Sequence, residues 1–257
     1  MPTNLTPMAA DSEVQATFWD HLDELRSCII RSLVVLAVVA AAAFAMKDQL
    51  FAVVLAPRSS VFVSYRLLGV EPFSIHLMNT GLTEQFMVHI RVAVYAGLMG
   101  ALPYILYVLF GFVAPGLYRN ERRAAVKILG SAYAMFVLGT LVCYFIIFPL
   151  TVRFLGTYQV STDVDNMLTI QSYVDTLISM SFVLGIVFEL PVVCAILGRM
   201  GFIDGRLMAR FRKHAVVVIL IVAAIITPTT DAFTLLVVAL PVWLLYEVSI
   251  LIVKMKD

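Results

Sequence analysis

Long apolar runs, separated by shorter polar segments, recur along the whole chain. Six of them stand out, at about 28–46, 86–112, 124–150, 172–198, 214–228 and 232–253. A helix needs about 20 apolar residues to cross the roughly 30 Å hydrocarbon core of a bilayer, and all but the fifth run are long enough. The pattern predicts an all-α integral membrane protein with six transmembrane helices, in one membrane domain that covers residues 1–257.

The fifth run, HAVVVILIVAAIIT, ends at Pro228 and falls several residues short of a full span. Irregular backbone cannot face lipid, because its polar groups would have no hydrogen-bond partners there. We therefore expect a short spanning helix at 214–228 that thins the bilayer locally. Helices 5 and 6 are expected to be the short ones of the set.

The segments outside the runs carry weaker helical patterns. Residues 1–27 form a cytoplasmic tail whose second part, 12–27, spaces its apolar residues as an amphipathic lead-in helix. The first long loop starts with KDQLFAVVLAP, which is typical of a short helix in the membrane interface. Four prolines fall inside the runs, at Pro103, Pro149, Pro191 and Pro241. Each removes a backbone donor, so we expect kinked helices that form a concave wall.

Composition excludes a soluble globular protein. Apolar residues make up 61% of the chain and charged residues 14%, with a mean hydropathy of +0.96. Soluble domains usually have about 45–50% apolar and about 25% charged residues. The charged residues form no basic block of the kind that binds nucleic acid.

The positions of the basic residues predict the orientation. Of the 18 Lys and Arg residues, five fall on the side opposite to the two termini: Lys47, Arg58, Arg66, Arg91 and Arg153. The other basic residues fall on the side of the termini. Because cytoplasmic loops carry the excess of basic residues, both termini are predicted to be cytoplasmic.

Residues typical of catalysis or metal binding do not form recognisable motifs. The four histidines are never paired at i,i+4, and the chain has no H-E-x-x-H, G-x-S-x-G or Walker A sequence. Cys28, Cys143 and Cys194 lie in apolar runs without C-x-x-C spacing, which is typical of small buried hydrophobic residues. We expect neither an enzyme nor a bound metal or cofactor.

One acidic residue lies deep in an apolar run. Glu189, in FVLGIVFELPVV, is nine residues from the inner end of the fourth run, or roughly 13 Å deep. An ionised side chain at the bilayer centre costs at least about 2.5–3.5 kcal/mol and should face protein or water. Two interpretations remain: a protonated or hydrogen-bonded residue that holds helices together or, as we favour, a docking or gating contact beside a bend at Pro191. Glu247, near the inner end of the last run, is expected to be structural.

Two more acids flank the first and third runs on the predicted cytoplasmic side. Glu24 lies in HLDELR and Glu121 in GFVAPGLYRNERR. Each has an ordinary explanation, because Glu24 can pair with Arg26 and an acid in a first helical turn complements the helix dipole. Together they also offer two carboxylates to a cationic peptide, since guanidinium groups prefer carboxylate partners.

Six segments together resemble the TatC family, the multispanning subunits of the twin-arginine protein translocase. They are HLDELR at 21–26, VLAP at 54–57, GFVAPGLYRNERR at 111–123, FVLGIVFELPV at 182–192, ITPTTDAFT at 226–234 and ALPVWLLYE at 239–247. The resemblance implies a glove-shaped, six-helix protein of the bacterial cytoplasmic membrane, whose cytoplasmic face binds the Arg-Arg motif of signal peptides. It also implies TatA and TatB as partners, association with further copies of itself, and export of folded proteins driven by the proton-motive force.

The resemblance also assigns roles to individual residues. Those implied in signal-peptide binding are Glu24, Arg26, Phe112, Tyr118, Glu121 and Arg122. The two glutamates would hold the twin arginines, and the two aromatic residues would shape the adjacent surface. Glu189, followed by Pro191, would meet a polar residue in a TatA or TatB helix.

Three further positions match structural residues of the family: Pro57, Pro115 and Asp231. Near Asp231 this chain reads TPTTD where many members read TPPD. An N-terminal cap of the last helix is the alternative interpretation of this aspartate.

Two alternatives from other classes remain open. One is a proton-coupled small-solute transporter with Glu189 as its proton site, although the runs at 124–150 and 214–228 differ too much in length to be repeats. The other is a structural scaffold without a binding site. Loss of Arg-Arg peptide binding in a Glu121→Gln variant would separate a receptor from both.

Overall fold

The computed structural model describes residues 8–67, 69, 73, 75–113, 119–158, 167–227 and 231–254, and only the backbone of 8–21, 110, 113, 119–125 and 127. Nearly all of this part is helical. In chain order the elements are α1 (Met8–Ala45), α2 (Lys47–Leu55), the 3-10 turn η1 (Ala56–Arg58), α3 (Val63–Leu67), β1 (Leu77–Met78), α4 (Glu84–Val113), α5 (Arg119–Val142), the π-helical turn η3 (Cys143–Ile147), α6 (Phe148–Thr157), β2 (Leu168–Thr169), α7 (Ile170–Val187), α8 (Leu190–Arg199), α9 (Gly205–Arg210), α10 (Arg212–Ile226) and α11 (Ala232–Lys254).

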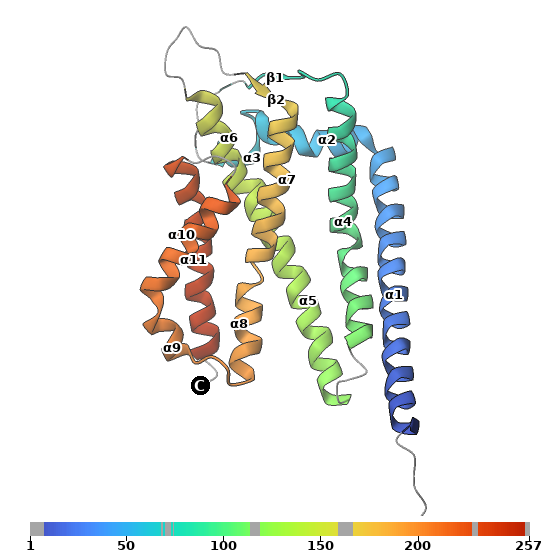
Figure 1. Ribbon diagram of the computed structural model, residues 1–257. Coiled ribbons are helices and arrows are strands. Elements are labelled where there is room, and N and C mark those ends of the chain that lie inside the picture. The colour runs from blue at the N-terminus through green and yellow to red at the C-terminus, as the bar shows by residue number, and fades with distance from the viewer. Residues whose placement is uncertain are drawn as a thin grey trace, which may run out of the picture.

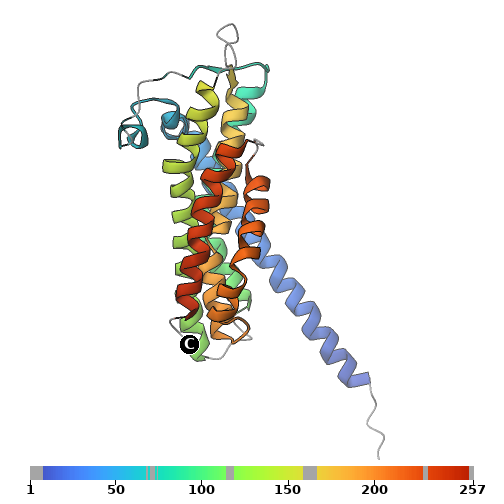
Figure 2. The same cartoon turned by 90° about the vertical axis from the view of Figure 1, so that its left-hand side faces the viewer.

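The long helices lie side by side in one broad, thin wall. Figure 1 shows the wall from its broad side, with α1 at one edge and α9 to α11 at the other. Figure 2 shows it edge-on, with the N-terminal part of α1 leaving the other helices. Along the wall α1 packs against α4, α5 against α7, and α8 against α11. The start of α1 and the end of α11 lie at the same end of the wall.

Residues 47–67, which contain α2, η1 and α3, cross the other end of the wall, and we call this segment the roof (Figure 1). The interfacial helix predicted from KDQLFAVVLAP is present as α2. Next to the roof, β1 and β2 pair in parallel, with Leu77 opposite Leu168. This short pairing joins the two loops that precede α4 and α7, so it brings the first turns of these helices together.

Five helical segments are long and apolar enough to cross a bilayer: Leu22–Ala45, Glu84–Leu109, Ile128–Thr157, Ile170–Arg199 and Ala232–Lys254. They correspond to five of the six predicted runs. The last of them forms α11, which has 23 residues, so the prediction that helix 6 is short is wrong. The remaining run forms α10, which has 15 residues and is therefore only about 22 Å long. A helix of that length does not cover a roughly 30 Å core without thinning it. The count of six spans stays a prediction.

Two helical segments extend beyond the runs that predicted them. No boundary separates the lead-in at 12–27 from the run at 28–46, because α1 contains neither Gly nor Pro and continues from Met8 to Ala45. The third run also extends past residue 150, to the end of α6 at Thr157.

Two of the four prolines interrupt the α-helical pattern. Pro149 follows the π-helical turn η3, and its missing N–H leaves the Phe145 carbonyl without its intrahelical donor. The Ser64 hydroxyl of α3 donates to that carbonyl instead. Pro191 follows a break at Phe188–Glu189 between α7 and α8. Pro103 and Pro241, by contrast, lie inside helices that continue past them.

Two glycines permit close approaches between helices of the wall. A Cβ atom at Gly97 of α4 would lie 2.7 Å from the Ala40 Cα of α1. A Cβ atom at Gly139 of α5 would lie 2.7 Å from the Phe188 ring. Such distances are below van der Waals contact, so a larger residue at either position must push the two helices apart.

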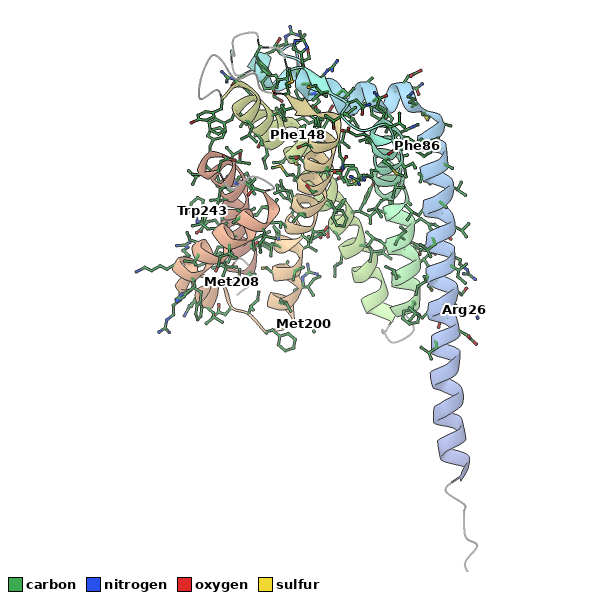
Figure 3. The ribbon with its side chains drawn as sticks, turned by 45° about the horizontal axis from the view of Figure 1, so that its top comes forward. Arg26, Phe86, Phe148, Met200, Met208 and Trp243 are labelled. Carbon is green, nitrogen blue, oxygen red and sulfur yellow. The ribbon has the colours of Figure 1, made fainter. Side chains whose placement is uncertain are left out.

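Two of the three cysteines are buried as predicted. Cys28 and Cys143 are buried, and Cys194 is partly exposed. Cys143 belongs to the main core, which also contains Phe148, Met180 and Leu184 and is built from α4, η3, α6, α7, α10 and α11 (Figure 3).

Candidate functional site

The predicted peptide-binding acid of α1 is free of intrachain partners in the described part of the chain. Glu24 and Arg26 are both exposed, and neither makes a hydrogen bond or ion pair with a described side chain. Figure 3 shows Arg26 on the part of α1 that lies far from the roof. The predicted pairing of Glu24 with Arg26 is therefore absent.

The packing of α1 on α4 fixes the level at which Glu24 lies. The Cys28 sulfur is 4.0 Å from the Val108 carbonyl oxygen, so these two residues face one another across the helix pair. The helices run in opposite directions (Figure 1). Glu24 lies one turn before Cys28, and Phe112 lies one turn after Val108. The structure thus brings Glu24 and the half-buried Phe112 to the same end of the wall.

The third helix contributes the second predicted acid. Glu121 and Arg122 lie in the first turn of α5, and their side chains lie outside the described part. Pro115 and Tyr118 lie outside the described residues altogether. The start of α5 is at the end of the wall opposite the roof, as is the N-terminal part of α1 (Figure 1). The backbone therefore brings both acidic segments to one end of the molecule.

Glu189 occupies the break between α7 and α8. Its side chain is half-buried and has no hydrogen-bond or ion-pair partner among the described side chains. Its carbonyl oxygen accepts from the amides of Val192 and Val193, at 3.0 Å each, and so starts α8. The neighbouring Phe188 ring packs on Gly139, and Pro191 is buried. A Glu without a partner is not one that holds helices together by hydrogen bonds.

At the roof end, two residues that sequence reasoning marked as structural have clear partners. Pro57 is buried, and its carbonyl oxygen is 2.9 Å from the Tyr65 hydroxyl, which also lies 2.8 Å from the Pro149 carbonyl oxygen. Asp231 accepts a hydrogen bond of 2.7 Å from the Thr234 amide, so it caps the first turn of α11.

Sequence reasoning missed a buried acid at the roof end, Glu84. One carboxylate oxygen accepts from the Thr80 amide at 2.8 Å, the Gly81 amide at 2.8 Å and the Thr80 hydroxyl at 3.1 Å. The other oxygen accepts from the Gln171 amide at 3.1 Å. One side chain therefore binds amides of the loop before α4 and an amide in the first turn of α7. The available signal was an acid directly before an apolar run.

Two ion pairs were also missed. The Arg91 Nη1 atom of α4 lies 2.6 Å from the Asp175 Oδ1 atom of α7, and both side chains are about half exposed on the wall. Arg212 and Glu247 are 2.7 Å apart, at the end opposite the roof. Both pairs join residues that are distant in the sequence, so spacing along the chain carried no signal for them.

Two hollows flank Tyr95 between α4 and α7. One, of about 440 Å³, lies under α2 and has an almost entirely apolar lining that includes Val92, Met99 and Leu177. The other, of about 590 Å³, carries the Arg91–Asp175 pair among apolar residues such as Val94. The Tyr95 hydroxyl is buried and has no hydrogen-bond partner in the described residues. The two hollows therefore offer space for an apolar chain, with few polar groups to contact it.

These features define a multi-pass helical membrane protein. It has an internally hydrogen-bonded roof, acidic segments gathered at the opposite end and, inside a span, a carboxyl group without a partner among the described side chains. Within the described residues no group of three or more His, Cys, Asp or Glu is arranged to hold a metal ion.

Comparison with known proteins narrows the class. Residues 20–241 match the family model described as Sec-independent protein translocase protein (TatC). The chain is 35% identical over 238 residues to the TatC of Deinococcus radiodurans, covering 92% of this chain and 85% of that protein. It is 33% identical over 239 residues to the TatC of Carboxydothermus hydrogenoformans, with 93% of each chain covered.

The fold is similar to that of solved relatives. A crystal structure of the twin-arginine translocase receptor TatC superimposes with a TM-score of 0.72 at 31% identity, over 91% of this chain and 98% of that one. A second, of the same receptor in DDM, gives a TM-score of 0.73 at 30% identity. The chain belongs to the TatC family of the Sec-independent protein translocase, so its class is protein transport in the membrane by the twin-arginine pathway.

Proposed function

We propose that this chain is the core subunit and signal-peptide receptor of a twin-arginine translocase. The observation that carries the proposal is the match over more than nine-tenths of the chain to a structure described as the receptor TatC. Family membership favours protein transport over the transport of small solutes. In this function the chain works with TatA, TatB and further copies of itself, and the proton-motive force drives the export of folded proteins.

The proposed orientation has both termini in the cytoplasm of a bacterium, with the roof on the outer side of the inner membrane. The excess of basic residues on the side of the termini supports it. So does the position of the two ends of the chain at one end of the wall, because an even number of spans returns the chain to the side where it started (Figure 1). With α10 counted as a short span, the number is six.

Capture of the signal peptide begins with the two carboxylates. Glu24 and Glu121 hold the adjacent arginines of the peptide through charge-assisted hydrogen bonds, each worth about 1.5–3 kcal/mol when well formed. The exposure of Glu24, without a competing partner among the described side chains, supports this role. Arg26 and Arg122 belong to the same proposed binding surface, which Phe112 and Tyr118 complete.

The apolar part of the peptide then follows the concave side of the wall toward Glu189. This residue and Pro191 form the proposed contact with a polar group in a TatA or TatB helix. The support is the position of an unpartnered carboxyl group at a helix break inside a span. Pro57, Pro115 and Asp231 have structural roles in this proposal.

The binding experiment compares an Arg-Arg signal peptide with its Lys-Lys counterpart on the purified full-length chain. Glu121→Gln is expected to weaken Arg-Arg binding by about ten- to a hundredfold, because one charge-assisted contact is lost. Asp23→Asn, an exposed acid beside Glu24, is the matched control and should leave binding unchanged. Equal affinity for the Arg-Arg and Lys-Lys peptides, or full binding by the Glu121→Gln variant, contradicts the receptor function.

The role of Glu189 is tested by export of a folded substrate and by co-purification of TatB. Glu189→Gln should reduce both, since the amide lacks the charge of the carboxylate. Glu247→Gln, which removes an acid already paired with Arg212, is the control. Unchanged assembly and export in the Glu189→Gln variant leave this residue without a docking role.

A further inference from the structure

A narrow groove runs between α5 and α8 toward the end of the wall opposite the roof. Its volume is about 270 Å³. On α5 it is lined by Ile128, Ser131 and Met135, and on α8 by Pro191, Ala195 and Arg199. The spacing on each helix is that of one face, so the groove follows the helix axes. Eight residues separate Pro191 from Arg199, which makes the groove about 12 Å long.

The groove is apolar except at one end. Ser131 is its polar residue inside the span, and its hydroxyl donates to the Ile128 carbonyl of its own helix at 2.8 Å. Arg199, in the last turn of α8, is exposed and makes no ion pair with any described side chain. The lining thus pairs a hydrocarbon-like channel with one guanidinium group at the membrane boundary.

Two more basic residues lie at about the level of Arg199. Gly198 packs on Val253, so the next residues, Arg199 and Lys254, lie at the same level. Gly205 packs on the backbone of Lys254, which brings Arg206 next to them. Met200, which follows Arg199, lies at this same end of the wall (Figure 3).

Nearby acids that are described have other partners. Glu247 pairs with Arg212 at 2.7 Å, and Asp204 accepts from the Arg206 amide at 2.9 Å, as the cap of α9. The charge around the mouth of the groove is therefore positive.

We infer that this groove binds one acyl chain of an anionic phospholipid, with Arg199 on the phosphate. A groove about 12 Å long matches one leaflet of a roughly 30 Å hydrocarbon core. An α-helix is about 10 Å across, so 12 Å of it fills roughly 900 Å³, several times the volume available. A single hydrocarbon chain fits the groove, fills a space that otherwise lacks packing contacts, and sets its headgroup at the level of Arg199.

The guanidinium group gives the site its preference for anionic lipids. Arginine can bind a phosphate group through two parallel hydrogen bonds, and Lys254 and Arg206 favour a headgroup with a net negative charge. A phosphatidylcholine headgroup carries its own cation, which these three residues repel. The site shares Pro191 with the proposed TatA or TatB contact but does not include Glu24 or Glu121, and it does not depend on the function proposed for these two acids.

The test counts lipids retained by the purified full-length chain in native mass spectrometry. The chain is first equilibrated with equal amounts of phosphatidylglycerol and phosphatidylcholine. We expect at least fivefold more phosphatidylglycerol on the wild type and loss of that preference in Arg199→Gln. Arg210→Gln, an exposed arginine outside the groove, is the matched control and should behave as the wild type.

A second variant tests the groove rather than the charge. Ala195→Trp fills the channel and keeps every cation, so retention of both lipids should fall at least threefold. If this variant does not fold, Ser131→Leu narrows the same channel and takes its place. An Arg199→Gln protein within twofold of the Arg210→Gln control, or unchanged retention in the groove-filling variant, overturns the lipid site.

Discussion

Two acidic residues at opposite ends of the wall, Glu84 and Glu24, differ in whether they have partners inside the described part of the chain. At the roof end, Glu84 accepts four hydrogen bonds, and the hydroxyls of Tyr65, Tyr144 and Tyr173 all lie within hydrogen-bond distance of backbone carbonyls. At the other end, Glu24 is exposed and makes no contact of this kind with a described side chain. Polar groups that are satisfied inside the chain stabilise it, whereas those left without an internal partner are available for binding.

Hydrogen bonds to the end of a helix help to hold the roof in place. The last carbonyls of a helix have no intrahelical donors. At the end of α2 the Val53 carbonyl, which accepts from the Ala56 amide, also accepts from the Tyr144 hydroxyl at 2.6 Å, and the Val54 carbonyl accepts from the Tyr173 hydroxyl at 3.1 Å. Tyr65 is fully buried, and burial raises the pKa of its phenol, so it remains a neutral donor at physiological pH. The roof is thereby attached to the spanning helices beneath it.

The largest effect is expected from Glu84→Ala. This change leaves amides of two helix starts without their acceptor, so the free energy of unfolding should fall by roughly 3 kcal/mol or more. For a chain of this size that corresponds to a decrease of about 6–12 °C in the midpoint of thermal unfolding in detergent. Gln85→Ala, an exposed neighbour, is the control and should change the midpoint little. Equal midpoints for the two variants would mean that the roof does not depend on its internal hydrogen bonds.

The second effect concerns the contact that holds α1 on the wall. Gly97→Ala places a methyl group 2.7 Å from the Ala40 backbone, so the helices must separate, at a cost of about 1–3 kcal/mol. Thermal unfolding of the purified chain measures the loss. Gly130→Ala is the matched control, because its new methyl group meets open space. It should be neutral or stabilising by up to about 1 kcal/mol.

A smaller effect is expected from Tyr173→Phe. The variant keeps the ring but loses the hydrogen bond to Val54, which contributes about 1 kcal/mol. Hydrogen exchange of the α2 amides should increase more than that of the other helices. Tyr104→Phe, on an exposed side chain, provides the comparison. Uniform exchange in all helices would show that the hydroxyl does not hold the roof in particular.

The smallest effect on stability should come from Glu24→Gln, at the end with free polar groups. The change should alter the free energy of unfolding by less than about 0.5 kcal/mol, because the side chain is exposed. The same variant should bind an Arg-Arg signal peptide about tenfold more weakly, measured by fluorescence anisotropy. A large loss of stability instead would remove the contrast between the two ends.

Much of the wall followed from pattern alone. Apolar runs predicted each long helix, KDQLFAVVLAP predicted α2, and the prolines predicted two of the observed interruptions. The six segments that resemble TatC also predicted the family. The pattern did not predict how far α1 extends toward its N-terminus, because no Gly or Pro marks a boundary there. It also did not decide whether α10 spans the bilayer, because 15 residues are too few for a full span.

The hydrogen-bond and ion-pair partners of individual side chains could not be predicted from the sequence. A Glu directly before an apolar run could have been one exposed acid among several. The pairing of β1 with β2 and the packing of α4 on α7 place the start of α7 within reach of Glu84. Arg91 of α4 and Asp175 of α7 likewise form an ion pair although they are 84 positions apart in the sequence.

The sequence by itself determined which five segments are long and apolar enough to cross a membrane and to which family the chain belongs, because hydropathy and local motifs act over a few turns. The tertiary structure decided which polar groups are already satisfied and which stay free. That distinction depends on distances of about 3 Å between residues remote in the chain, and hydrogen bonds form only at such distances.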